Sequence, residues 1–142
     1  MNIGIIGFGI MGEGLSQYLS CFEHIKKIYI KTGKKKFFDK NIFLKKLKIN
    51  CRLLKKNFNE EMADKIVVVE DYNEFNKCSI VIESITENLK SKSDLLKDLS
   101  EKLSLDIIIS SNTSSLMQKQ LIGSIKYPDR FCCIHFFNPL WN

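Results

Sequence analysis

A glycine-rich hexapeptide near the start of the chain has the residue types and spacing of a phosphate-binding loop. Residues 7–12 read GFGIMG and fit the pattern GxGxxG. In this pattern the first glycine allows a tight turn, the second lets the backbone approach a pyrophosphate, and the third lets a helix pack closely on a strand. Free N–H groups and the positive end of the helix dipole then face the phosphates. A glycine turn without a ligand is the alternative. We predict that the loop binds a dinucleotide cofactor through Gly7, Gly9, Ile10, Met11 and Gly12.

The end of the next predicted strand bears on which dinucleotide is bound. Sites for NAD usually place Asp or Glu there, about 20 residues further on, to hold the ribose 2′-hydroxyl. Here the strand ends at Lys31 and Thr32, and no carboxylate is available. Because a cation and a hydroxyl suit a 2′-phosphate, the sequence predicts an NAD site at which Lys31 allows NADP to bind. A solvated lysine without a role in binding is the alternative.

Three further segments carry polar side chains suited to catalysis or binding: residues 81–92 (VIESITENLKSK), 111–116 (SNTSSL) and 129–139 (DRFCCIHFFNP). By residue type, His135 suits a general base, since imidazole titrates near neutral pH. A single histidine in an apolar run is, however, more often a core residue. Taken alone, Ser114 suits a helix N-cap, and Glu87 and Lys92 suit a solvated first helical turn.

Together with the glycine loop, these segments resemble the NAD-binding domain of 3-hydroxyacyl-CoA dehydrogenases. The resemblance covers nearly the whole chain and is weak at residues 31–65. It implies the reversible oxidation of a 3-hydroxyacyl-CoA to a 3-oxoacyl-CoA, with a hydride passing from C3 to the nicotinamide. It further implies that His135 is the general base and that Ser114 binds the substrate oxygen beside the nicotinamide. Glu87 and Lys92 match positions that contact the cofactor.

The resemblance also implies parts that these residues do not supply. The family pairs its histidine with a glutamate about a dozen residues further on, which orients the imidazole. A helical C-terminal domain closes the acyl-CoA cleft and forms the dimer, whereas this sequence ends at Asn142. We therefore expect residues 1–142 to form one dinucleotide-binding domain that is weakly active or inactive alone and joins a homo-oligomer or a helical partner chain. A non-catalytic nucleotide-binding or interaction module is the alternative. We expect an exposed apolar patch at Phe136, Phe137, Leu140 and Trp141.

The elements that must position these residues alternate between strands and helices. Several predicted strands are continuous apolar runs, as in a parallel sheet that is covered on both faces. We predict strands at residues 3–6, 27–30, 66–69, 79–83, 106–110 and 131–136. We predict helices at residues 11–22, 37–58, 89–103 and 114–122, and a short helix or turn at residues 71–76. This order indicates a Rossmann-like, doubly wound α/β domain with a mainly parallel sheet and helices on both faces.

The composition is that of one globular domain. The 142 residues are 44% hydrophobic and 27% charged, which provides one core and excludes a disordered chain. No apolar run reaches the roughly 18 residues of a membrane span, and the N-terminus lacks a secretory signal, so we predict a cytoplasmic protein without membrane contact. The five cysteines lack CxxC spacing and only two histidines accompany them, which favours reduced thiols and no metal site.

Positive charge is concentrated in one segment. Residues 26–56 hold 13 Lys and Arg against a single acid, Asp39, within a chain of net charge +6. Three interpretations stay open: a surface for the phosphates of an acyl-CoA substrate, a surface for nucleic acid or an acidic carrier protein, and a solvated lysine face. Because the sequence contains no nucleic-acid-binding motif, we do not expect nucleic acid to be the partner.

Overall fold

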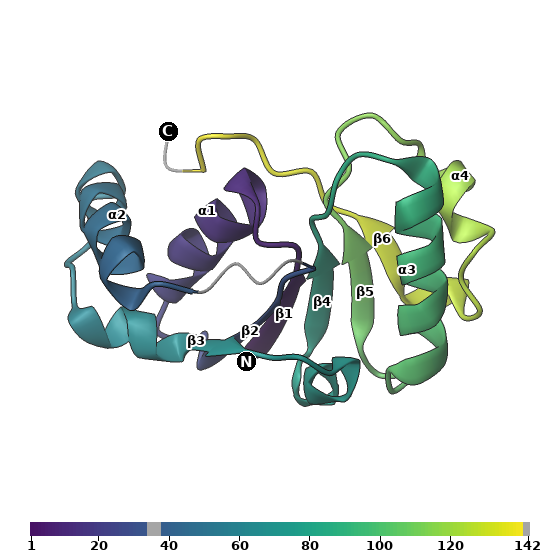
Figure 1. Ribbon diagram of the computed structural model, residues 1–142, viewed down its shortest axis with the longest axis horizontal. Coiled ribbons are helices and arrows are strands. Elements are labelled where there is room, and N and C mark those ends of the chain that lie inside the picture. Colours follow the sequence, from purple (N-terminus) through teal and green to yellow (C-terminus); the bar gives the residue numbers. More distant parts are fainter. Residues whose placement is uncertain (34–37, 141–142) are drawn as a thin grey trace.

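The computed structural model describes residues 1–33 and 38–140. In this part of the chain six parallel strands form one sheet in the order β3-β2-β1-β4-β5-β6 (Figure 1). The strands are β1 (Asn2–Ile6), β2 (Lys27–Lys31), β3 (Ile66–Val68), β4 (Ile80–Glu83), β5 (Ile108–Ser111) and β6 (Phe131–Cys133). Two βαβαβ halves therefore meet between β1 and β4, which confirms the predicted Rossmann-like α/β class.

Helices cover both faces of this sheet. They are α1 (Ile10–Ser20), α2 (Lys40–Leu53), α3 (Leu89–Lys102) and α4 (Gln118–Ile122), with the short 3-10 helices η1 (Glu60–Lys65), η2 (Tyr72–Lys77) and η3 (Pro128–Arg130). Since successive residues of a strand point to opposite faces, β1 contributes to two cores. Ile3 and Ile5 pack with Leu15 of α1, whereas Ile6 packs in the cluster of Leu96 in α3. Helix α2 packs beside α1 (Figure 1).

Two predicted elements are shorter than expected. The helix predicted at 114–122 begins only at Gln118, and Ser114 and Ser115 lie in a turn before it whose N–H groups donate to the carboxylate of Glu87 from another segment. The strand predicted at 131–136 ends at Cys133, and the N–H of Phe136 donates to a side-chain oxygen instead. The N-cap interpretation of Ser114 is therefore wrong.

Local capping also sets the bounds of the lysine-rich helix. The side chain of Asp39 accepts hydrogen bonds from the N–H groups of Asn41 and Ile42, so α2 begins at Lys40. The helix ends at Leu53, and Lys55 takes a positive φ of 52°. The prediction of residues 37–58 was thus too long at its C-terminal end, and residue 37 lies outside the described residues. The short helix or turn predicted at 71–76 is the 3-10 helix η2.

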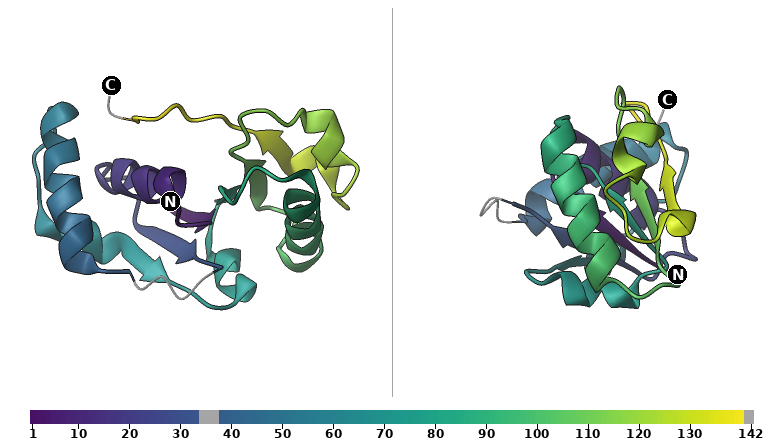
Figure 2. Two further views of the ribbon diagram at one scale, coloured as in Figure 1. Left: turned by 45° about the horizontal axis from the view of Figure 1, so that its top comes forward. Right: turned by 90° about the vertical axis from the view of Figure 1, so that its right-hand side faces the viewer.

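After β6 the chain leaves the sheet and runs toward α1 and α2 (Figure 2). Phe136 and Leu140 of this segment pack against the core cluster beneath α1 and are only partly exposed. The expected apolar patch is therefore smaller than predicted: Phe137 remains 76% exposed, and Trp141 lies outside the described residues. Among the described helices, none is long and apolar enough to cross a membrane.

Candidate cofactor and catalytic site

The glycine loop lies where β1 and β4 diverge, at the carboxyl ends of both strands. Gly7 has a positive φ of 100°, and a Cβ atom on it would lie 2.4 Å from the carbonyl oxygen of Ser84. A Cβ atom on Gly12 would lie 1.9 Å from the carbonyl oxygen of Gly7. The fold therefore requires glycine at both positions. Gly7 is needed for its positive φ, and both glycines are needed because another main-chain atom lies too close for a Cβ atom.

Gly9 differs from these two glycines because, apart from its own chain neighbours, no atom of the residues that the structure describes lies within 4 Å of the position that its Cβ would take. It precedes α1 directly, and no side chain caps this end of the helix. The space beside Gly9 and the first N–H groups of an 11-residue helix together suit a pyrophosphate. The loop that the sequence predicts to bind the dinucleotide thus has the geometry for it.

A cavity of about 490 Å³ opens beside the loop. It gathers residues from four segments that are distant in sequence. They are Gly9, Ile10 and Met11 of the loop, Ser84 to Glu87 after β4, Asn112 and Ser114 after β5, and His135 to Asn138 after β6. The predicted residues Glu87, Ser114 and His135 therefore line one cavity with the glycine loop, whereas Lys31 and Lys92 do not line it.

His135 follows β6 and is exposed at the cavity. Its ring lies edge-on to Phe137, with 4.6 Å between ring centroids. The main chain beside it is fixed because the N–H of Phe136 donates to Oδ1 of Asn112 over 2.9 Å. His135 is therefore not a core residue, and its imidazole is available to a ligand. Sequence reasoning missed the positioning by Asn112, although the residue lies inside the motif at 111–116.

Glu87 ties the turn after β5 to the turn after β4. Its Oε1 accepts hydrogen bonds from the N–H groups of Ser114 and Ser115 over 2.9 and 3.0 Å, and from the hydroxyl of Thr113. The other carboxylate oxygen of Glu87, Oε2, lies 3.3 Å from Nζ of Lys92. In this structure Glu87 therefore holds Ser114 at the cavity through its backbone. A solvated helical turn, the alternative for Glu87, is wrong.

Lys92 is fully buried although it lies in the first turn of α3. Its Nζ donates to Oε1 of Glu83 over 2.6 Å and to the carbonyl oxygen of Ile85 over 3.3 Å. Glu83 is also fully buried and accepts from Ser111 Oγ over 2.6 Å. The solvated alternative for Lys92 is thus wrong. Its contact with the cofactor stays a prediction, because Lys92 is fully buried and does not line the cavity. Glu83 was missed, and a glutamate ending an apolar strand was the available signal.

The pKa of Glu87 links this network to acid stability. Partial burial raises the pKa of Glu87. Hydrogen bonds from Thr113 and Ser115 and the charge of Lys92 lower it by more than burial raises it, so the pKa falls from an ordinary 4.5 to about 2. Ionised Glu87 therefore stabilises the fold above pH 4.5, and this contribution is lost as the pH falls through about 2. We expect Glu87→Gln to flatten the decline of unfolding free energy between these values, measured by urea denaturation.

The matched control for this prediction is Glu101→Gln, which changes an exposed carboxyl group on α3. Its profile of unfolding free energy against pH should keep the wild-type slope across the same range. Equal slopes for Glu87→Gln and the wild type would show that the hydrogen bonds to this carboxylate do not persist in solution.

Lys31 ends β2, on the far side of β1 from β4. Its ammonium donates to the carbonyl oxygen of Glu70 and lies 5.0 Å from the centre of the Tyr72 ring. To meet a 2′-phosphate the ammonium would have to leave both groups. Binding of NADP through Lys31 stays a prediction, and the solvated alternative does not describe this lysine.

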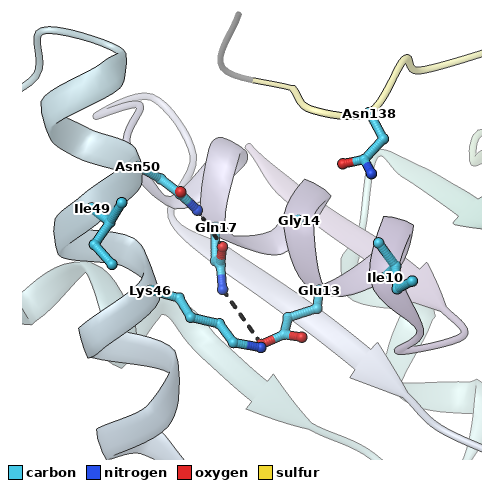
Figure 3. A pocket seen from close by; sticks show the side chains of 8 residues that line it. All are labelled: Ile10, Glu13, Gly14, Gln17, Lys46, Ile49, Asn50 and Asn138. Atoms are coloured by element: carbon cyan, nitrogen blue, oxygen red, sulfur yellow. Dashed lines mark hydrogen bonds and ion pairs between the residues drawn. The ribbon is translucent and has the colours of Figure 1, made fainter.

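A second pocket, of about 260 Å³, lies between α1, α2 and the segment after β6 (Figure 3). Polar side chains from the two helices are connected across it. Nζ of Lys46 pairs with Glu13 over 2.7 Å, and the amides of Gln17 and Asn50 are hydrogen-bonded. Asn138 lines this pocket as well as the cavity beside His135, so the two hollows adjoin.

The strand order, the glycine loop between β1 and β4 and the adjacent cavity define a Rossmann-type dinucleotide-binding domain. The sequence matches the family described as 3-hydroxyacyl-CoA dehydrogenase, NAD binding domain, over residues 2–142. This chain belongs to that family, and its cofactor is NAD.

Solved structures of dehydrogenases have the same fold. M. tuberculosis FadB2 is 25% identical with a TM-score of 0.83, and the match covers 97% of this chain and 50% of that one. (S)-3-hydroxybutyryl-CoA dehydrogenase PaaH1 from Ralstonia eutropha is 28% identical with a TM-score of 0.80, and the match covers 98% and 50%. This chain therefore spans about half the length of these two proteins. A search of curated proteins gives no match.

Proposed function

We propose that this chain is the cofactor-binding part of an oxidoreductase that interconverts 3-hydroxyacyl-CoA and 3-oxoacyl-CoA. The cavity of about 490 Å³ carries the proposal, because the glycine loop, Ser114 and His135 all line it. A hydroxyl group, an imidazole and a loop suited to a dinucleotide are the groups that oxidation of a secondary alcohol requires. The relative from Ralstonia eutropha is named for its substrate, (S)-3-hydroxybutyryl-CoA, which is a 3-hydroxyacyl-CoA.

The chemistry follows from the groups at this cavity. A nicotinamide dinucleotide held at the glycine loop would supply the acceptor for a hydride from C3 of the substrate. His135 accepts the hydroxyl proton as the C3–H bond breaks and the C3 carbonyl forms, and it returns this proton in the reverse reaction. Ser114 donates a hydrogen bond to the C3 oxygen. Glu87, by holding the backbone of Ser114, fixes the position of that hydroxyl group.

The nucleotide end of the substrate would extend toward α2. The pocket beside α2 adjoins the catalytic cavity through Ile10 and Asn138. Lys46 of α2 lines this pocket, and the same helix carries the exposed cations Lys45 and Lys48. Phosphates of coenzyme A are suitable partners for such a cationic face. This favours the acyl-CoA interpretation of the basic segment over the solvated one.

A further helical unit would complete the enzyme. The relatives with solved structures are about twice as long as this chain, and Phe137 is 76% exposed beside His135. A large exposed aromatic residue at the rim of a site suits contact with a second unit. We propose that this unit is a helical domain or partner chain, that the assembly is a homo-oligomer, and that it works in the cytoplasm.

The test is to measure cofactor binding and turnover separately. We expect the chain to bind NADH, followed by fluorescence, and to oxidise NADH slowly with acetoacetyl-CoA. His135→Ala should keep the dissociation constant for NADH and lower turnover by about 10²–10⁴-fold, the usual contribution of a general base. The matched control is His24→Ala, whose ring packs against Phe22 away from the cavity.

Each departure from this pattern has a clear meaning. Equal losses of turnover in the two histidine variants would contradict the role of His135. NADH binding without turnover would favour the non-catalytic module only if turnover stayed absent after the proposed helical unit was supplied, because the isolated chain is expected to be weakly active or inactive. Failure to bind NADH would contradict the cofactor site itself.

A further inference from the structure

Three sulfur atoms meet between α1, α2 and η1. Cys21 caps the end of α1, Cys51 belongs to α2, and Met62 belongs to η1. The Sγ atoms of the two cysteines are 3.6 Å apart, and Sγ of Cys51 is 3.9 Å from Sδ of Met62. Both cysteines are buried, and all five cysteines of the chain are free thiols.

The two sulfur–sulfur separations that involve Cys51 are close to those between ligands of one metal ion. With metal–sulfur bonds of about 2.3 Å, two ligands at tetrahedral or trigonal angles are about 3.8–4.0 Å apart. The observed distances of 3.6 and 3.9 Å are close to this range, so an ion could be held with small movements of the side chains. In a disulfide the two sulfur atoms would be about 2.05 Å apart.

The ligand types restrict which ion fits. Two thiolates and a thioether are soft donors, which favour Cu(I). Zinc prefers four ligands from Cys, His and carboxylates, and no group of three or more such side chains is placed to hold an ion within residues 1–33 and 38–140. We propose that Cys21, Cys51 and Met62 form a three-coordinate binding site for Cu(I), independent of the dinucleotide site.

An entry path reaches this cluster from solvent. A pocket of about 790 Å³ is lined by Cys21 and Met62 together with Lys56, Lys65 and His24, among others. Cys21 follows the last residue of α1, whereas the glycine loop precedes the first. Eleven helical residues of about 1.5 Å each separate the two sites by about 16 Å. Occupation of one site therefore does not block the other.

Two lysines near the cluster would offset part of the charge that the bound ion leaves on the two thiolates. Cu(I) displaces one proton from each thiol to solvent, and the ion with two thiolates carries a net charge of −1. Burial and the neighbouring thiol of Cys51 raise the pKa of Cys21, whereas the positive charges of Lys65 and Lys56 lower it. Lys65 is held in place by the carbonyl oxygens of Ser20 and Phe22 at 2.9 and 2.8 Å. These two lysines would offset the negative charge of the complex.

The test is an anaerobic titration of the reduced chain with Cu(I) in competition with a chromogenic Cu(I) chelator. It is run in a Cys132→Ser/Cys133→Ser background, because that adjacent pair is a second source of thiolates. We expect one Cu(I) per chain, three sulfur neighbours by X-ray absorption, a rise in melting temperature, and affinity for Zn²⁺ at least about 100-fold weaker. Cys21→Ser or Cys51→Ser should lower Cu(I) affinity by more than about 100-fold.

Two further variants keep the test decisive if a serine variant unfolds. Met62→Leu preserves side-chain volume, and it should lower affinity about tenfold and remove one sulfur neighbour. Cys78→Ser is the matched control, because Cys78 is buried in a different core cluster, and it should change nothing. Equal affinity in wild type, Cys21→Ser and Met62→Leu would overturn the proposal. So would a Cu(I) complex without sulfur neighbours, or formation of a Cys21–Cys51 disulfide in place of metal binding.

Discussion

Gly9→Ala is expected to weaken NAD binding at least about tenfold, or 1.4 kcal/mol, while leaving the fold intact. Beyond the two chain neighbours of Gly9, no atom within residues 1–33 and 38–140 lies within 4 Å of the position that the new methyl group would take, so these residues do not oppose it. A pyrophosphate on the loop would occupy this same space. The loss should therefore appear in the dissociation constant for NADH and not in the unfolding free energy.

Gly12→Ala is the matched comparison within the same loop. Its methyl group would lie 1.9 Å from the carbonyl oxygen of Gly7, a main-chain atom that no rotamer change can move. We expect the unfolding free energy to fall by about 3 kcal/mol or more, measured by urea denaturation. Unchanged NADH binding by a folded Gly9→Ala variant would contradict the predicted path of the cofactor over the loop.

Lys92→Met is expected to cost about 3–5 kcal/mol of unfolding free energy, because it leaves the buried carboxylate of Glu83 without its cation. The hydrogen bonds to Glu83 from Ser111 and from the N–H of Ile85 remain, but they do not replace the lost positive charge. Glu87 also loses the ammonium 3.3 Å from its carboxylate. Urea denaturation at pH 7 measures the cost.

Lys90→Met provides the control two residues away on α3. Lys90 pairs with Asp94 across one helical turn, and both side chains are largely exposed, so this pair should contribute less than about 0.5 kcal/mol. The double variant Glu83→Leu/Lys92→Met should recover part of the loss, since it removes both buried charges together. Similar losses in Lys90→Met and Lys92→Met would contradict the buried ion pair.

The parts of the structure that local sequence encodes could be predicted. The glycine loop is a contiguous motif between a strand and a helix, and the apolar runs at Ile3–Ile6 and Ile80–Glu83 identify buried parallel strands. These features were enough to predict the fold class. The motif residues Glu87, Ser114 and His135 were also selected from sequence, through their resemblance to a family.

The remaining features depend on contacts between distant segments. Burial of Lys92 requires Glu83, which lies on a different element, and lysine in a first helical turn is ordinarily solvated. The turn before α4 is held by the carboxylate of Glu87, which accepts from the N–H groups of Ser114 and Ser115. Helix periodicity contains no information about such a contact with a distant segment, and the predicted helix at 114–122 was too long.

The position of Asn138 has a thermodynamic consequence. This residue lies on the segment that leaves β6, and it forms part of the wall of both adjoining hollows. A molecule that occupies one hollow restricts the same stretch of main chain that the other must use. Any change that a molecule in one hollow makes to the affinity of the other hollow must be matched by an equal change in the reverse direction.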